Sequence, residues 1–421
     1  MGVGCPARPL PQLPTALLDS QRTIPVSSHH ILERHHTRVA WTFPSLATGY
    51  YWQPVFKEFV KLFKTTVIFT DVWSGYVRGC EGKFTVDQRS SHARSPYEQG
   101  PRFVWASPSL VPALLRFRPH VVFTSGFHIW TAYLLLFKPF MRWKIILVWD
   151  GVSPKLTDSG RRIRLMWRRL IARYFSLCVT NTRQGAEYLI EAVKMKPDRI
   201  IQYPYQVPDR LTLCAESSAK AVAGRHPTFL FVGALVYGKG IHKFLEACSL
   251  LVRIEVRAFS CTFLGQGPNQ QEFQQLADEL GLHEHVTWLG PVPYGALGTY
   301  YSAHDVLVLP SFGDVWGTIV PEAMLFGKAI LCSRHAGAKE LVREGENGFV
   351  FDPADAHELA DYMLRLIWNP EMLTSFGRRS KQIIEPYTPE RAAAVFDQTI
   401  ARVLGTATGP AGCANPARTG Q

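Results

Sequence analysis

Short apolar segments alternate with helical patterns along most of the chain, and this alternation limits the possible folds more than any other feature. Strand-like segments lie at 38–43, 120–126, 144–151, 176–181 and 199–204, and then at 228–233, 258–265, 286–290, 305–311 and 329–333. After the first segment, a turn at Gly49 precedes a helical spacing of Val55, Phe59 and Phe63. Short apolar strands joined by helices form parallel sheets covered on both faces. The sequence therefore predicts two α/β halves of similar size.

Changes in composition predict the domain limits within the 421 residues. Residues 1–37 are rich in Pro, Ser and His and lack apolar periodicity, so we expect a flexible extension outside the core. The polar segment 206–227 suits a linker, 389–404 is helical by composition, and 405–421 should be a disordered tail. The two α/β halves then span 38–205 and 228–388.

Cysteine usage and the N-terminal residues predict a reduced, cytosolic protein. The eight cysteines are scattered without a C-x-x-C pair, and the first residues lack the charged start and apolar core of a signal peptide. The apolar stretch 121–137 is interrupted by Ser125, Gly126 and His128, and Pro139 follows it. This stretch therefore predicts a strand, a loop and a short helix rather than a membrane span.

The net charge of +12 suggests polyanionic partners, and segment 161–173 holds six arginines. The arginines expected to contact a membrane or an anionic acceptor are Arg161, Arg162, Arg164, Arg168 and Arg169. The apolar residues that share one face of this helix are Ile163, Met166, Trp167, Leu170, Ile171 and Tyr174. Two interpretations stay open: an anionic lipid surface, or an ordinary helix whose apolar face packs on the core. Nucleic acid is not expected, because no recognised binding motif accompanies the charge.

The turn 233-GALVYGKG-240 nearly matches a phosphate-binding P-loop. Its last position is Gly240, so the hydroxyl that would hold magnesium is missing and a P-loop triphosphatase is disfavoured. Lys239 and the N–H groups of the helix from Ile241 would suit a diphosphate. A plain strand-to-helix turn is an equally good interpretation of this segment alone, and the turn at Gly265 carries still less information.

Two acids, Asp314 and Glu322, lie eight residues apart in an apolar segment. We expect a helix from Thr318, acting as N-cap, to Phe326, with Gly327 as its C-terminal cap. Asp314 then lies in the preceding loop and Glu322 one turn inside the helix. Carboxylates around a helix N-terminus suit a ligand with hydroxyls and an anionic centre, such as a nucleotide sugar, although both acids could simply complement the helix dipole or a turn.

Five segments, taken in their order along the chain, resemble the retaining glycosyltransferases of family 4, which have the GT-B fold. They are 231–240, 264–268, 289–293, 309–330 and 345–351. The resemblance spans about residues 228–390. It implies two Rossmann-like domains that face each other across a cleft, with the donor bound mainly to the second domain. The helix 389–404 is similar to the one that returns to the first domain in that family.

The resemblance also implies roles for individual residues. Glu322 should hold the ribose hydroxyls, Asp314 should lie near hydroxyls of the transferred sugar, and Lys239 should bind the diphosphate. The family's diphosphate arginine is Ala234 here, and Ser125 aligns with its first-domain histidine, with His128 three residues on. The candidate catalytic residues are Asp314, Lys239, His128 and Asp150, although an ordinary turn acid explains Asp150 equally well. The full set of expected donor contacts is Gly49, Gly233, Lys239, Gly265, Val292, Asp314, Gly317, Thr318, Ile319 and Glu322.

The predicted function is retaining transfer of a sugar from a nucleotide-diphosphate-sugar to a lipid-linked or polysaccharide acceptor, in cell-envelope or exopolysaccharide synthesis. No D-x-D motif occurs, so no metal or other cofactor is expected. We expect the protein at the inner face of the cell membrane. The alternatives are a nucleotide-sugar epimerase on the same fold and an inactive scaffold subunit that binds membrane or a partner enzyme.

Overall fold

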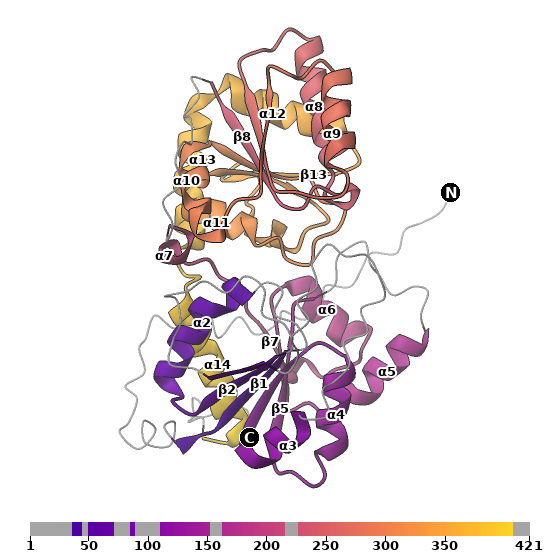
Figure 1. Ribbon diagram of the computed structural model, residues 1–421, viewed down its shortest axis with the longest axis vertical. Helices are drawn as coiled ribbons and strands as arrows, with labels where there is room; N and C mark the ends of the chain where they lie inside the picture. Colours follow the sequence, from indigo (N-terminus) through magenta and orange to yellow (C-terminus); the bar gives the residue numbers. More distant parts are fainter. Residues whose placement is uncertain are drawn as a thin grey trace, which may run out of the picture.

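The computed structural model describes residues 36–43, 49–70, 85–88, 110–151, 162–214 and 226–406. These residues form two α/β domains, drawn one above the other in Figure 1. Most of the predicted extension, half of the predicted linker and most of the predicted tail lie outside the described residues. The domain limits at those places therefore stay predictions.

The first domain contains a parallel sheet of seven strands in the order β3-β2-β1-β4-β5-β6-β7. The strands are β1 (Val39–Phe43), β2 (Thr66–Thr70), β3 (Thr85–Gln88), β4 (Val121–Ser125), β5 (Lys144–Trp149), β6 (Leu177–Thr180) and β7 (Ile200–Gln202). Along β1, Val39, Trp41 and Phe43 pack on one face and Ala40 on the other. Both faces are apolar because helices cover both of them.

The second domain contains a parallel sheet of six strands in the order β10-β9-β8-β11-β12-β13. The strands are β8 (Thr228–Val232), β9 (Ser260–Leu264), β10 (Val286–Gly290), β11 (Val306–Leu309), β12 (Ala329–Ser333) and β13 (Gly348–Phe351). In each sheet the loops that follow the strands gather at one edge, because parallel strands end on the same side.

Helices cover the two faces of each sheet. Those of the first domain are α2 (Gly49–Leu62), α3 (Leu110–Phe117), α4 (Ile129–Phe137), α5 (Arg162–Ala172) and α6 (Arg183–Glu191). Those that follow are α7 (Arg210–Leu213), α8 (Ile241–Arg253), α9 (Gln270–Glu279), α10 (Leu297–Ala303), α11 (Ile319–Leu325), α12 (Ala356–Trp368), α13 (Pro370–Ile384) and α14 (Pro389–Leu404). Short 3₁₀ segments are η2 (Pro197–Arg199), η3 (Tyr237–Lys239), η4 (Tyr294–Ala296) and η5 (Gly337–Leu341). Among the described residues, no helix combines the length and apolar character needed to cross a bilayer.

The last helix, α14, returns to the first domain and packs beside α2 (Figure 1). Phe396 is fully buried there, with its ring centroid 5.0 Å from that of Trp41 and 5.5 Å from that of Phe123. The predicted returning helix is therefore confirmed. It completes the core of a domain whose other elements lie far earlier in the sequence.

The predicted strands are confirmed in all ten segments, but three strands were missed: β2, β3 and β13. The segment Gly348–Phe351 has only four residues and follows a turn, so its run is too short to separate from a loop by periodicity. The predicted strand, loop and short helix at 121–137 are confirmed by β4 and α4.

Helix α5 does not present its predicted apolar face to the core. Of the six apolar residues on that face only Ile171 is buried, whereas the other five, such as Met166 and Trp167, are exposed. The side toward the sheet is formed by Leu165, Ile171 and Ala172 instead. The interpretation as an ordinary core-facing helix was therefore wrong.

We expect Phe396→Ala to lower the free energy of unfolding by about 3–5 kcal/mol. The substitution leaves a cavity between four rings, those of Trp41, Trp52, Phe123 and Tyr205. Gln398→Ala, on the exposed side of the same helix, is the matched control. Denaturant titration of the two variants measures the difference. Equal stabilities would contradict the packing of α14 on the first domain.

Candidate active site

Three loops converge at the edge of the second sheet that faces the first domain. They follow β8, β9 and β11, and their glycines allow the backbones to touch. A Cβ on Gly265 (φ +138°) would lie 1.8 Å from the carbonyl oxygen of Gly233, and one on Gly240 (φ +73°) 1.9 Å from that of Pro310. Only glycine fits at these two positions. The predicted contacts Gly233 and Gly265 are therefore neighbours.

Lys239 and Asp314 form an ion pair at the same edge. The Nζ of Lys239 lies 2.5 Å from the Oδ2 of Asp314, and the two side chains are 31% and 19% exposed. The N–H of Asp314 donates to the carbonyl of His335, and the carbonyl of Asp314 accepts from the N–H of Gly337. These two bonds hold the loop that carries Asp314. The structure thus places a cation and an anion together where each can still reach a ligand.

Glu322 lies in the first turn of α11 and is buried, with 1% of its surface exposed. Its Oε1 accepts a hydrogen bond from Tyr294 (3.1 Å), its Oε2 accepts one from Tyr301 (2.6 Å), and Tyr51 of α2 donates a third. Burial raises the pKa of the Glu322 carboxyl to about 7, and the three tyrosine hydroxyls oppose that rise. Tyr51 belongs to the first domain, so this carboxylate contacts both domains.

Three of the other predicted donor contacts, Gly317, Thr318 and Ile319, precede Glu322 in the chain. Gly317 (φ +90°) opens the turn before α11, and Val292 packs on the same core as Ile319. Thr318 occupies the N-cap position, but it has helical dihedral angles and its side chain makes no capping hydrogen bond, so the predicted capping role was wrong. Gly327, predicted as the C-terminal cap, follows the helix with a φ of +69°.

Asp150 follows β5 and lies at the domain junction. Its Oδ1 accepts hydrogen bonds from the hydroxyl of Tyr205 (2.6 Å), the amide of Gln206 (3.1 Å) and the amide of Asn181 (3.5 Å). The side chain is accessible to solvent, yet the surrounding protein atoms still raise the pKa of its carboxyl by desolvation. A Cβ on the next residue, Gly151, would touch Val315, the neighbour of Asp314.

His128 follows β4 and precedes α4. Its Nε2 lies 3.4 Å from the Oγ of Ser125, and its Nδ1 is enclosed with no hydrogen-bond partner among the described residues. Burial lowers the pKa of this histidine to about 3, so the ring is neutral at physiological pH. Its contacts are with its own loop, whereas Asp150 bonds to Tyr205 and Gln206, where the chain leaves the first domain.

Two further contacts join the domains. The carboxylate of Glu340 accepts hydrogen bonds from the backbone N–H groups of Arg183 (2.8 Å) and Gln184 (3.3 Å), at the N-terminus of α6. The indole of Trp316 donates to the carbonyl of Gln206 over 3.2 Å. Because Trp316 is two residues from Asp314, this bond holds the Asp314 loop next to the Asp150 network.

The predicted basic residues of α5 separate into two groups. Arg162, Arg164 and Arg169 are exposed, while Arg161 lies outside the described residues. Arg168 points inward instead: it donates to the hydroxyl of Tyr188 (2.6 Å), and its guanidinium lies 5.9 Å from the ring centroid of Trp149. Arg168 therefore stabilises the first domain and does not belong to the exposed basic surface.

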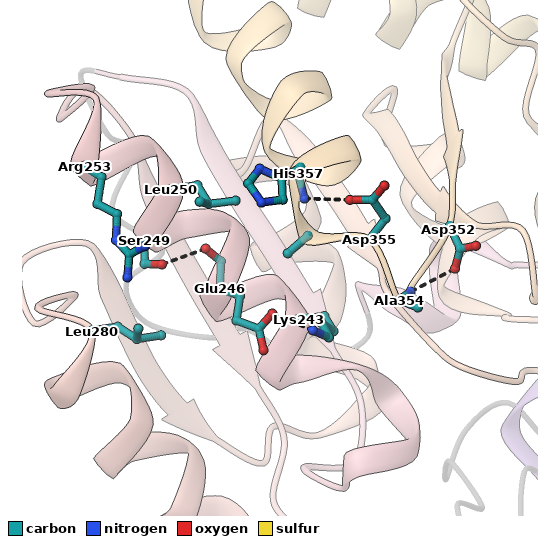
Figure 2. A pocket seen from close by; sticks show the side chains of 11 residues that line it. Lys243, Glu246, Ser249, Leu250, Arg253, Leu280, Asp352, Ala354, Asp355 and His357 are labelled. Atoms are coloured by element: carbon teal, nitrogen blue, oxygen red, sulfur yellow. Dashed lines mark hydrogen bonds and ion pairs between the residues drawn. The ribbon is translucent and has the colours of Figure 1, made fainter.

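A cavity of about 520 Å³ lies between α8 and α12, and Figure 2 shows the side chains that line it. Two of its charged residues already have partners within the protein. Lys243 pairs with Glu246 over 2.6 Å, and Asp355 caps α12 by accepting from the N–H of His357. None of the predicted site residues lines this cavity. The candidate site is therefore the junction of the two domains.

Sequence reasoning missed the tyrosines around Glu322 and the two residues, Trp316 and Glu340, that connect the domains. Two of the tyrosines could have been found from their distance in sequence to predicted donor contacts. Tyr51 is two residues after Gly49 and Tyr294 is two residues after Val292, and both glycine and valine were expected near the donor. Glu340 carried no such signal, because its partners are backbone groups about 157 residues away in sequence.

Comparison with known proteins agrees with this architecture. The family profile described as "Glycosyl transferases group 1" matches residues 215–383, and that described as "Glycosyl transferase 4-like domain" matches residues 48–206. The chain therefore belongs to the glycosyl transferase group 1 family, which is glycosyltransferase family 4, and has the predicted GT-B fold.

The D-inositol 3-phosphate glycosyltransferase of Nocardia farcinica is a curated relative, 29% identical over 216 residues, which are 48% of this chain and 47% of that protein. Alignments with this relative and four others span 36% to 60% of those proteins' lengths, so each covers less than two thirds of the relative.

Two solved structures share the fold. Anabaena HepE in complex with UDP has a TM-score of 0.66 at 15% identity, and the alignment covers 88% of this chain and all of HepE. The lipopolysaccharide outer core galactosyltransferase WaaB has a TM-score of 0.63 at 14% identity, with 87% of this chain and 99% of WaaB covered.

The buried Glu322 gives a pH-dependent prediction. Its pKa is about 7 in the folded protein and 4.5 ordinarily, so between these values the folded state binds more protons than the unfolded state. The stability of the wild type should then fall as pH rises from 5 to 8, by up to about 3 kcal/mol relative to Glu322→Gln, which cannot titrate. Denaturant titration of both proteins at the two pH values measures this. A constant difference would show that the carboxyl titrates normally.

Proposed function

We propose that this protein is a retaining glycosyltransferase that moves a sugar from a nucleotide-diphosphate-sugar to a lipid-linked or polysaccharide acceptor. The observation that carries the proposal is the Lys239–Asp314 ion pair in the loops that precede α8 and α11, with Glu322 buried in the first turn of α11. The family and the UDP in the HepE structure support a nucleotide donor. The name of WaaB supports a lipopolysaccharide-like glycan as one acceptor class.

Lys239 would bind the donor diphosphate together with the N-terminus of α8, which begins at Ile241 directly after the loop. The diphosphate would replace Asp314 as the anion that faces the ammonium group. Asp314 would then be released to accept hydrogen bonds from hydroxyls of the sugar. Ala234 supplies no charge in this region, so the developing charge of the leaving group depends strongly on Lys239.

The transfer step breaks the bond between the anomeric carbon and the diphosphate oxygen. The acceptor hydroxyl approaches from the same face and forms the new glycosidic bond, and its proton passes to the departing diphosphate. No metal or covalent protein intermediate is required. The Asp150 carboxylate, oriented by Tyr205 and Gln206, is the group we place on the acceptor side of the junction.

Lys239→Met should reduce sugar transfer by about 100-fold or more, because it removes the cation that pairs with Asp314 and would bind the diphosphate. Lys243→Met is the matched control, since Lys243 lies four residues further on, in α8, and pairs with Glu246. Release of nucleotide from UDP-glucose, UDP-galactose and GDP-mannose, with product mass from a membrane lipid extract, gives the readout. Equal losses in the two variants would contradict the role of Lys239.

An inactive scaffold is the second candidate, because Ala234 lacks charge and tyrosines surround Glu322. Calorimetry with UDP, GDP and ADP separates the two functions. Binding of none of the three would favour the scaffold, whereas binding of one would favour the enzyme. An epimerase would be distinguished by conversion of the donor without consumption of an acceptor.

We also propose that the first domain binds an anionic membrane surface, at the inner face of the cell membrane, through α4 and α5. Apolar side chains lie exposed on both helices and the turn after α4: Ile163 is 82% exposed and Phe140 80%, and Leu136 and Met166 are also exposed. Lys138 in that turn donates to the carbonyl of Tyr174, which joins the two segments. Exposed apolar residues flanked by arginines are typical of peripheral membrane binding.

The double variant Arg164→Gln/Arg169→Gln should reduce flotation with phosphatidylglycerol vesicles, and salt should weaken the wild type in the same way. The control Arg253→Gln/Arg257→Gln changes two exposed arginines of the second domain and lowers the net charge equally, from +12 to +10. Equal losses in both double variants would show that total charge, not the α4–α5 surface, governs binding.

A further inference from the structure

The carboxylate of Glu322 accepts hydrogen bonds from three tyrosines, and one of them comes from the opposite domain. Tyr294 and Tyr301 lie on η4 and α10 of the second domain, while Tyr51 lies in α2 of the first. A carboxylate has about four acceptor positions, so three of them are already used. One position remains, so the two ribose hydroxyls of a nucleotide can both bond to Glu322 only if one tyrosine gives up its place.

Tyr51 is the one of the three tyrosines that a ligand can replace without changing the packing within the second domain. Tyr301 is fully buried in the core of the second domain, and its short bond to Oε2 is part of that packing. Tyr51, by contrast, reaches Glu322 from across the junction, and its ring packs edge-on against Tyr294 with centroids 5.5 Å apart. A nucleotide held between the domains, as in the proposed function, would meet the Tyr51 hydroxyl where it reaches Glu322.

We propose that Tyr51 is a positioning residue whose hydroxyl takes the place on Glu322 that a donor ribose hydroxyl needs, so that nucleotide binding exchanges one inter-domain hydrogen bond for one to ribose. The proposal rests on the glycosyltransferase function proposed above. It makes the first domain a competitor of the donor for one buried carboxylate. It also keeps that carboxylate hydrogen-bonded when ribose does not contact it, which limits the cost of its burial.

The exchange predicts that loss of the Tyr51 hydroxyl strengthens nucleotide binding. Tyr51→Phe keeps the ring that packs on Tyr294 and removes only the competing hydrogen bond, so the affinity for UDP should rise by about 3-fold to 10-fold. The gain should be smaller for 2′-deoxy-UDP, because that probe lacks one of the ribose hydroxyls that would bond to Glu322. A residue with a merely structural role would not give a gain that depends on a ribose hydroxyl.

The experiment is calorimetry on the full chain with UDP and 2′-deoxy-UDP, and with GDP and 2′-deoxy-GDP as a second pair. The proteins are wild type, Tyr51→Phe and Tyr174→Phe, a matched control at an exposed tyrosine of the same domain. Tighter binding of the ribonucleotide by Tyr51→Phe alone supports the proposal, as does binding that appears only in that variant.

Two results would overturn the proposal. If the wild type binds a nucleotide and Tyr51→Phe binds it equally or more weakly, or gains equally for the deoxy probe, the exchange is wrong while the glycosyltransferase function stands. If neither protein binds any of the four nucleotides, the proposed function fails, and the role of Tyr51 fails with it.

Discussion

The candidate site depends on one constraint, which is that both sheets are parallel and present their carboxyl-terminal edges to each other. Every strand of a parallel sheet delivers its following loop to the same edge. Loops separated by long stretches of sequence, such as those with Gly233, Asp150 and Asp314, therefore meet at one junction. The glycines at 240 and 265 then let the backbones approach closely enough for the side chains between them to converge.

Much of the fold could be predicted from the sequence, because buried parallel strands are locally apolar and the helices between them are amphipathic. The ten predicted strands and the helix at 389–404 needed no knowledge of their partners, whereas the return of that helix to the first domain was implied by the family resemblance. The four-residue strand at Gly348–Phe351 was missed because so short a run has no measurable period. The orientation of α5 could not be read from its pattern either, since an apolar face shows only that a face exists and not what covers it.

The site was predictable in its chemistry but not in its contacts. Lys239 and Asp314 were identified from their spacing to glycines and strands, and the structure pairs them. The tyrosines around Glu322 and the bond from Glu340 to α6 join residues of different domains, and no local pattern records which distant residue will complete a hydrogen bond. His128 and Asp150 looked equivalent in sequence. Their surroundings differ, because Asp150 bonds to residues where the chain leaves the first domain, while His128 contacts its own loop.

The returning helix also determines how the two domains can move. The chain crosses from the first domain to the second after Tyr205 and returns before Pro389, and the rings of Tyr203 and Tyr387 lie 6.0 Å apart beside these two crossings. Tyr387 packs on the cores of both domains. Two adjacent covalent crossings act as a hinge, so separation of the domains is a rotation about this place. Loops far from the hinge then move furthest, because displacement in a rotation grows with distance from the axis.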